Sequence, residues 1–233
     1  MRPFLTAEWR NLILLTYSVE PSKLQPWLPD GLTLDIIDDR AFVSFVAFDF
    51  LRTRVKGLPI PFHINFPEIN LRFYVKKGEQ RGVMFIKELV PKPCIALVAR
   101  KLYNEPYEAT PMKSFSKIEG SHLIIEHFFE YGGRKHDLKF VADNEPFMPE
   151  ADSTATFFKE HEWGYGLDHN GKLQQYRVEH PLWRIYPLRK RFHLNVDFGL
   201  LYGETWDFLG SKIPYSVLLA EGSAIKVFPG EIA

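Results

Sequence analysis

The sequence has one cysteine, Cys94, so it cannot form an internal disulfide. It also has no excess charge, because its 29 lysine and arginine residues equal its 29 aspartate and glutamate residues. A balanced chain has no long-range field to attract nucleic acid or an anionic membrane. We therefore expect neither nucleic acid nor a membrane as a partner. The apolar neighbours of Cys94 favour a buried thiol over a reactive one.

Long apolar runs are missing as well. The best candidate lies around Ala41–Leu51, where Asp49, Arg52 and Arg54 keep it below the ~20 apolar residues of a membrane-spanning helix. The first nine residues contain no apolar segment long enough for a signal peptide. Together with the single cysteine, these absences predict a cytoplasmic protein.

Most motifs that carry chemistry are absent. There is no GxxxxGK[ST] or GxGxxG phosphate cradle and no GxSxG nucleophile elbow. His161-Glu162 is not followed by a second histidine at zincin spacing. The eight histidines are dispersed, and we interpret His161 and His169 as solvated or core residues. We expect no metal and no cofactor.

The composition is that of an aromatic-rich globular protein. Hydrophobic residues make up 45% of the 233 residues and aromatic residues 15%, with 20 phenylalanines. This length fits one domain, which we expect to span residues 1–233, and the aromatic rings predict a core or pocket with large flat walls. The aromatic surplus also makes a homo-oligomer reasonable.

Apolar alternation and turn residues predict more strands than helices. We expect strands at Trp9–Tyr17, Leu32–Ile37, Ala41–Leu51, Glu68–Lys77, Val83–Val90, Met112–Ile118, His122–Tyr131, Lys135–Ala142, Trp163–Asp168, Leu173–His180, Trp183–Asp197, Tyr215–Leu219 and Ala224–Phe228. The segment Trp183–Asp197 is interrupted by Pro187. We expect a loop at Gly57–Pro67 and short helices at Glu20–Gln25, Asp152–Lys159 and Phe198–Phe208. This spacing favours a β-rich barrel or sandwich with a few inserted helices.

The stretch Cys94–Met112 stands out among these segments. It begins as an apolar run with helical spacing, carries Arg100, and breaks at Pro106-Tyr107. A helix that ends at a proline corner, with an arginine, a glutamate and a tyrosine at the break, is a place where a small pocket can form.

The strand Glu68–Tyr74 alternates between apolar and polar residues. In an open sheet its polar face would meet water. In a closed barrel Glu68, Asn70 and Arg72 would line a cavity, where opposite charges must pair with each other or with a ligand. A partly desolvated carboxylate in that position would have its pKa raised toward the range useful for proton transfer.

Several ordered motifs carry a resemblance to a known family. The segment Tyr17–Leu32, with its LPDGL corner, resembles the opening of acetoacetate decarboxylase-like proteins. Within that superfamily the chain is most similar to the YqjF-like branch of unknown function. The matching patterns are E-x-N-x-R-x-Y-V at Glu68–Val75, A-R-x-L-x-x-x-P-Y at Ala99–Tyr107 and V-x-H-P-x-W at Val178–Trp183.

The resemblance implies an α+β, β-rich fold, the acetoacetate decarboxylase-like barrel with an enclosed pocket. In the decarboxylases, paired lysines follow the proline corner, and the first forms a Schiff base with the keto acid. The matching positions here are Tyr107 and Glu108, and a phenol cannot form an iminium. The acid at Glu68 is retained. Lys101 and Lys113 are close in sequence, but helix and strand geometry place neither at the same point.

These observations predict a pocket for a small organic carboxylate or carbonyl compound, without acetoacetate decarboxylase activity. Glu68 and Tyr107 are the candidate catalytic residues, and Asn70, Arg72 and Arg100 are the candidate ligand-binding residues. Two alternatives stay open: a binding module without catalysis, and a structural or oligomer-forming domain with an internal ion-pair network.

Overall fold

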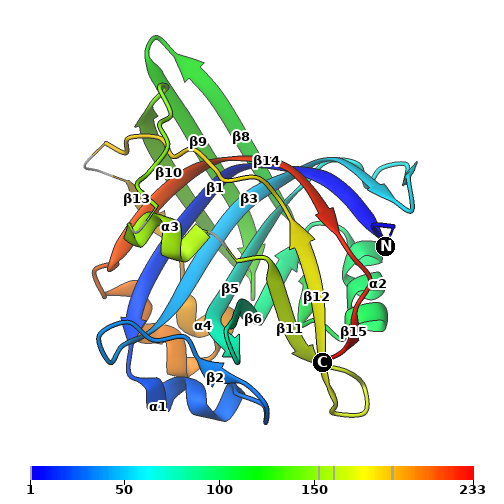
Figure 1. Ribbon diagram of the computed structural model, residues 1–233. Helices are drawn as coiled ribbons and strands as arrows, with labels where there is room; N and C mark the ends of the chain where they lie inside the picture. The colour runs from blue at the N-terminus through cyan, green and yellow to red at the C-terminus, as the bar shows by residue number, and fades with distance from the viewer. Residues whose placement is uncertain (1, 152, 160, 190–191) are drawn as a thin grey trace.

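The computed structural model describes residues 2–151, 153–159, 161–189 and 192–233. Its main element is a strongly curved sheet (Figure 1), with strands in the order β2-β5-β3-β1-β14-β12-β11-β6-β7 and with β4 and β15 added at the side. The strands are β1 (Leu5–Val19), β2 (Thr33–Leu34), β3 (Ala41–Val55), β4 (Leu58–Pro59), β5 (Phe66–Lys77), β6 (Gln80–Val90), β7 (Tyr107–Ala109), β11 (Trp163–Leu167), β12 (Leu173–Glu179), β14 (Ser216–Val227) and β15 (Glu231–Ile232).

A second pairing closes this sheet into a ring. The strands β5 and β6 form a hairpin across the turn at residues 78–79, and β6 also pairs with β11 at the other end of the strand order. Seven strands therefore surround an interior: β5, β3, β1, β14, β12, β11 and β6. Because side chains alternate across a strand, one residue in two points into the ring and the next points out.

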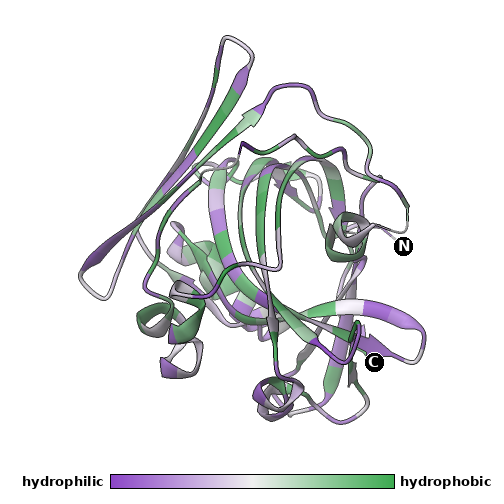
Figure 2. Cartoon of the chain, turned by 90° about the vertical axis from the view of Figure 1, so that its left-hand side faces the viewer, coloured by the Kyte–Doolittle hydropathy of each residue, from purple (hydrophilic) through white to green (hydrophobic). Residues whose placement is uncertain are grey.

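A smaller sheet covers the outer face of the ring. It contains β8 (Met112–Glu119), β9 (His122–Tyr131), β10 (Arg134–Asp143) and β13 (His193–Asn195), in the order β13-β10-β9-β8. Outward-facing Ile69, Leu71 and Phe73 of β5 are buried in one core with Ile125 and Phe140 of this sheet. Figure 2 shows it as a separate layer whose strands alternate hydrophobic and hydrophilic residues.

The helices are short, apart from α2. They are α1 (Pro21–Leu24), α2 (Pro93–Tyr103), α3 (Thr154–Lys159) and α4 (Phe198–Tyr202), with 3-10 turns η1 (Gln25–Trp27) and η2 (Glu204–Gly210). The helix α2 begins with proline in its first turn and ends at Asn104, whose φ of 50° is the left-handed conformation common at helix ends. In the part of the chain that the structure describes, no helix is long and apolar enough to cross a bilayer.

Most of the predicted elements are confirmed, including the β5–β6 hairpin and the helix that starts the stretch Cys94–Met112. Three predictions are wrong. Within Trp183–Asp197, only His193–Asn195 is a strand, because Pro187 interrupts the ladder. Residues 190–191 lie outside the described residues, and so does Asp152, at the predicted start of α3. The last two predicted strands form one strand, β14. Cys94 is exposed, because it lies in the first turn of a helix that covers the edge of the ring.

Candidate functional site

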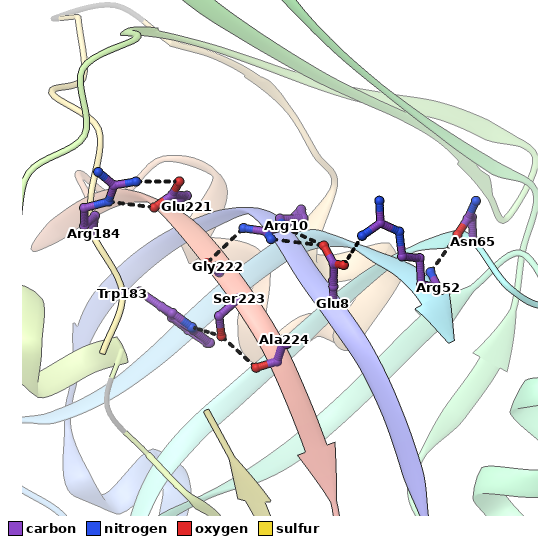
Figure 3. A network of polar contacts seen from close by, with 10 residues as sticks. All are labelled: Glu8, Arg10, Arg52, Asn65, Trp183, Arg184, Glu221, Gly222, Ser223 and Ala224. Carbon is purple, nitrogen blue, oxygen red and sulfur yellow. Dashed lines mark hydrogen bonds and ion pairs between the residues drawn. The ribbon is translucent and has the colours of Figure 1, made fainter. Parts of the chain in front are cut away.

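The interior of the ring contains a cavity of about 260 Å³. Every one of the seven ring strands contributes a side chain to its lining, and much of the wall is aromatic: Trp9, Phe48, Phe50, Phe66 and Trp183. These rings are in mutual contact; those of Phe50 and Phe66, for example, stack with their centroids 4.8 Å apart. The Trp183 indole donates a hydrogen bond to Ser223 Oγ at 2.8 Å, which fixes this ring in the wall (Figure 3).

Glu68 is the polar centre of the cavity. Its side chain is buried, with 2% exposure, and both carboxylate oxygens accept hydrogen bonds. Tyr107 Oη donates to Oε2 at 2.9 Å, and Asn70 Nδ2 donates to Oε1 at 3.1 Å. Burial raises the pKa of Glu68 to about 7, against the hydrogen bonds from Asn70 and Tyr107, which favour the carboxylate. This carboxyl group therefore changes charge near neutral pH.

Strand register brings these residues together. Asn70 on β5 is the Cα partner of Glu88 on β6, and Glu88 is the Cα partner of Tyr107 on β7. The three residues form one rung across three strands, and all three side chains line the cavity. Glu68 lies two residues before Asn70 on the same face, so its carboxylate lies within reach of Tyr107.

Two further carboxyl groups belong to this cluster, Glu88 and Glu105. Burial raises the pKa of Glu88 well above its usual value, and the charges of Glu68 and Glu105 raise it further. Burial also raises the pKa of Glu105 to about 8, despite a hydrogen bond from Tyr176. Glu88 and Glu105 therefore hold their protons at neutral pH, where Glu68 is half ionised.

A glycine makes room for Tyr176. Gly164 on β11 is the Cα partner of Tyr176 on β12, and a Cβ atom on Gly164 would lie only 2.3 Å from the phenol ring. Real side chains do not pack this closely, so the tyrosine can lie across β11 only because residue 164 is glycine. The phenol then reaches Glu105 from β12, across the neighbouring strand β11.

A second polar corner of the cavity contains Arg72 and His161. Arg72 donates from Nη2 to the Phe158 carbonyl at 3.2 Å, while its Nε has no partner. Both ring nitrogens of His161 are also buried without a partner. Burial and the nearby charges of Arg72, Arg81 and His180 hold the pKa of His161 well below its usual value, so it is neutral.

The structure brings together four of the five predicted site residues. Glu68, Asn70, Arg72 and Tyr107 all line the cavity. Arg100 does not: it is exposed on α2, because the face of the helix that lines the cavity carries Cys94, Ile95, Val98 and Ala99. The prediction that Arg100 contributes to the pocket is not supported by this placement.

Glu108, the neighbour of Tyr107, points away from the cavity. It accepts a hydrogen bond from Tyr131 at 2.6 Å and pairs with Lys87 at 3.2 Å on the outer face of the ring. Lys101 and Lys113 are exposed, and the described residues that line the cavity include no lysine. Within the same described residues there is no group of three or more histidine, cysteine, aspartate or glutamate side chains placed to hold a metal ion.

Sequence reasoning missed Glu88, Glu105 and Tyr176, and it assigned His161 no role. Glu88 had no usable signal, because a register shift in the β5–β6 hairpin brings it into the cavity in place of Lys87. Glu105 and Tyr176 interact although they are 71 residues apart in the chain, and no local pattern indicates this contact.

Comparisons with known proteins match this fold along its whole length. The family DUF2071, described as "Uncharacterized conserved protein", matches residues 6–224. Uncharacterized protein YqjF from Bacillus subtilis (strain 168) is 26% identical over 195 residues, which cover 81% of this chain and 77% of YqjF.

Solved structures with the same fold share little sequence with this chain. An acetoacetate decarboxylase-like enzyme from Sphingomonas wittichii RW1 has a TM-score of 0.68 at 12% identity, covering all of this chain and 94% of that one. Acetoacetate decarboxylase from Legionella pneumophila gives 0.66 at 13% identity, covering all of this chain and 88% of the other. The enduracididine biosynthesis enzyme MppR, complexed with pyruvate, gives 0.65 at 11% identity, with full coverage of this chain and 91% of MppR. At these identities the likeness shows the fold alone.

Proposed function

The chain belongs to the DUF2071 family and has an acetoacetate decarboxylase-like fold, and from that premise we propose that its cavity binds a small carbonyl compound and exchanges a proton with it. The observation that carries this proposal is the position of Glu68. Its buried carboxylate faces the cavity, is oriented by Tyr107 and Asn70, and has a pKa of about 7. A general base is most effective when its pKa lies near the operating pH.

The charges of the cavity favour a carbonyl group over a free anion. Three carboxyl groups line it, and Arg72 is the one lysine or arginine among the described lining residues. Protonated Glu88 and Glu105 can each donate a hydrogen bond to a carbonyl oxygen. A ligand that also carries a carboxylate would have to place it at Arg72, away from Glu68. MppR, which has the same fold, binds the keto acid pyruvate.

The proposed step is removal of a proton from the carbon next to the carbonyl. The Glu68 carboxylate accepts that proton, the electron pair of the C–H bond forms a C=C bond, and the π electron pair of the carbonyl group moves to its oxygen, giving an enolate. A protonated neighbour, Glu105 or Glu88, stabilises the enolate oxygen by hydrogen bonding. Return of a proton from Glu68 to the same carbon restores the ketone, so the step needs no co-reactant.

This proposal differs from acetoacetate decarboxylase chemistry, which uses a lysine amine. Tyr107 stands at the matching corner, and its buried phenol has a pKa raised well above the usual value by burial and by the Glu68 and Glu88 charges. It is therefore a hydrogen-bond donor rather than a nucleophile. We infer that any turnover proceeds without a covalent iminium.

Hydrogen–deuterium exchange tests the proposal. Small ketones and 2-oxo acids are incubated with the protein in deuterium oxide, and loss of the α-proton signal is followed by NMR. The wild-type protein should accelerate exchange for at least one compound, and Glu68→Gln should abolish the acceleration. Tyr107→Phe, which keeps the carboxylate but removes one hydrogen bond, should reduce it by about 10- to 100-fold.

The matched control is Glu119→Gln, the same change at an exposed glutamate on β8. It should exchange like the wild type. Exchange that is unchanged in Glu68→Gln would remove Glu68 from any catalytic role. A compound that binds but never exchanges would instead favour the second candidate function, a binding module without catalysis.

The structural alternative receives less support from the contacts. An internal ion-pair network would need Glu68 to pair with an arginine. Instead, Glu68 accepts from Tyr107 and Asn70, Arg72 donates to a backbone carbonyl, and Arg100 is exposed. A cytoplasmic location and a single domain over residues 1–233 complete the proposal.

Self-association is also part of the proposal, and the β8–β9 hairpin supports it. β8 is the edge strand of the smaller sheet. This hairpin carries three large exposed apolar side chains, Phe115, Ile118 and Phe128. The ring centroids of the two phenylalanines lie 6.0 Å apart. Exposed apolar edge strands are natural sites for pairing with another chain. A second copy that pairs along β8 would cover them.

A further inference from the structure

The mouth of the cavity lies between α2 and the loop that follows β3. Three residues at this point both line the cavity and are exposed: Ile60 of the loop, and Cys94 and Val98 of α2. The cavity therefore meets solvent there. Both segments lie on the right-hand side of Figure 1, beside the N-terminus. We call residues 52–64 and 92–101 the mouth face.

Large apolar side chains project from both sides of the mouth face. On the loop and helix together, the exposed residues are Leu58, Ile60, Phe62, Ile64, Leu97 and Val98. Phe62 is 87% exposed, and its φ of 65° lies in the left-handed region, which is uncommon for a bulky residue. A strained backbone that holds an aromatic ring out in solvent is a feature found at functional surfaces.

The two chain segments that form the mouth face contain basic residues and no acidic residue. Residues 50–67 contain Arg52, Arg54 and Lys56 without any aspartate or glutamate, and residues 91–104 contain Lys92, Arg100 and Lys101, again without an acid. The only ion pair that reaches this set among the described residues joins Arg52 to Glu8, at 2.5 Å (Figure 3). Even so, the Arg52 side chain remains 79% exposed. Arg52 and Arg54 also line a neighbouring groove together with Glu8, Glu162 and Glu179, so Lys56, Lys92, Arg100 and Lys101 are the cations of the mouth face that lie outside that groove.

We propose that the mouth face binds the surface of an anionic phospholipid bilayer. Apolar side chains on a basic background are the composition of segments that lie in the membrane interface, where the apolar groups enter the acyl boundary and the cations meet lipid phosphates. The cavity wall behind the mouth is aromatic, so an apolar ligand could pass from the bilayer into it without crossing water. The proposal stands whether or not Glu68 exchanges a proton.

Charge argues against a second copy as the occupant of this face. In a two-fold symmetric dimer the same patch meets itself, so Lys56, Lys92, Arg100 and Lys101 of one copy would lie against the same cations of the other. Like charges placed opposite each other across an interface are unfavourable. The β8–β9 hairpin, which carries both Lys117 and Glu119, has no such conflict.

Vesicle co-sedimentation tests the proposal. The full chain is spun with large unilamellar vesicles of phosphatidylcholine, with or without one quarter phosphatidylglycerol. The wild type should sediment with the anionic vesicles and remain in solution with the neutral ones, and high salt should release it. Leu58→Ser with Phe62→Ser should lower the bound fraction by about tenfold, and Arg54→Glu with Lys101→Glu should do the same.

The matched control replaces two apolar residues of similar exposure elsewhere, Phe115→Ser with Ile118→Ser on the β8–β9 hairpin. This variant should sediment like the wild type. The proposal is overturned if the wild type ignores anionic vesicles, or if the Leu58/Phe62 variant binds them unchanged. A wild type that ignores vesicles, but whose mass in light scattering falls in the Leu58/Phe62 variant, would identify the face as a contact between copies.

Discussion

Glu68, Glu88 and Glu105 are buried side chains that line one cavity, and their protonation determines which chemistry the cavity can support. Burial raises the pKa of all three groups, and each ionised carboxylate makes it harder for the next to ionise. Glu68 loses its proton first, because Tyr107 and Asn70 donate hydrogen bonds to its carboxylate. One base beside two acids results, and this is the arrangement that enolisation of a ketone requires.

The raised pKa of Glu105 predicts a pH effect on stability. An acid that binds its proton more tightly in the folded state makes stability fall as pH rises from its ordinary pKa of 4.5 to about 8. Glu105→Gln removes this loss. In urea unfolding, the free energy of unfolding of the variant relative to the wild type should therefore increase by about 3 kcal/mol between about pH 5 and about pH 8.

Glu119→Gln is the control for this experiment, because that glutamate is exposed and its pKa is lowered by Lys117. Its stability difference from the wild type should stay nearly constant over the same pH range. A Glu105→Gln variant that follows the pH profile of the wild type would show that Glu105 is ionised in the folded protein.

The sequence predicts site residues well where one strand carries them. The alternation of Glu68, Asn70 and Arg72 predicts their shared face, and the proline corner places Tyr107 beside it. Arg100 shows the limit of such reasoning: it lies in the right helix, but the rotation of that helix about its axis depends on tertiary packing.

At the scale of elements, a β-bulge in β6 determines which side chain enters the cavity. The register shifts between Leu71 and Arg72, where Ile86 becomes an extra residue on β6. Val83 and Phe85 line the cavity, so simple alternation would place Lys87 inside next. Because of the bulge, Lys87 instead donates to Tyr131 on the outer face, and Glu88 enters the cavity. Bulges are common next to functional sites, and no residue in the sequence marks this one.

Gly222 explains why β14 is one strand although two were predicted. A glycine in a strand usually signals a break, but here it has a φ of 78° and allows β14 to pass close to β1. A Cβ atom at this position would lie 2.0 Å from the Trp9 carbonyl oxygen.

Gly222→Ala should therefore destabilise the fold by about 3 kcal/mol, because it adds a backbone clash to an unfavourable φ. Gly57→Ala is the matched control, since Gly57 has a φ of 83° and nothing within 4 Å of the added Cβ. It should cost only about 1 kcal/mol in urea unfolding. Equal losses for the two variants would mean that β1 and β14 do not approach as closely as described.

At the scale of the whole molecule, the fold combines one ring of strands with two different cores. The outer face packs against a second sheet and the inner face surrounds the cavity, so β5 is buried on both sides although most of its inward residues are polar. Alternation in the sequence predicted the two faces. It could not predict that the ring closes, because closure depends on the pairing of β11 with β6, about 80 residues apart in the chain.

The distribution of charge, like the closure of the ring, depends on the fold and could not be predicted from the composition. A net charge of zero predicts no attraction to an anionic surface, but the sum says nothing about where the charges lie. The two acid-free segments come together only after α2 folds against the ring beside the loop of residues 56–65, so that Ile60 and Val98 line the same cavity. The sequence shows both acid-free segments, and the fold places them around one opening.

The measurement that bears most directly on the central claim is a ¹³C NMR titration of the Glu68 carboxyl group. The protein is labelled at glutamate side-chain carboxyl carbons, and the Glu68 signal is assigned by its loss in Glu68→Gln. We predict a titration with an apparent pKa of about 7, shifted from the ordinary 4.5 by burial beside Glu88. A Glu68 signal that titrates near its ordinary pKa would contradict the account, because a carboxylate that is fully ionised well below neutral pH is not a base tuned for proton exchange in this cavity.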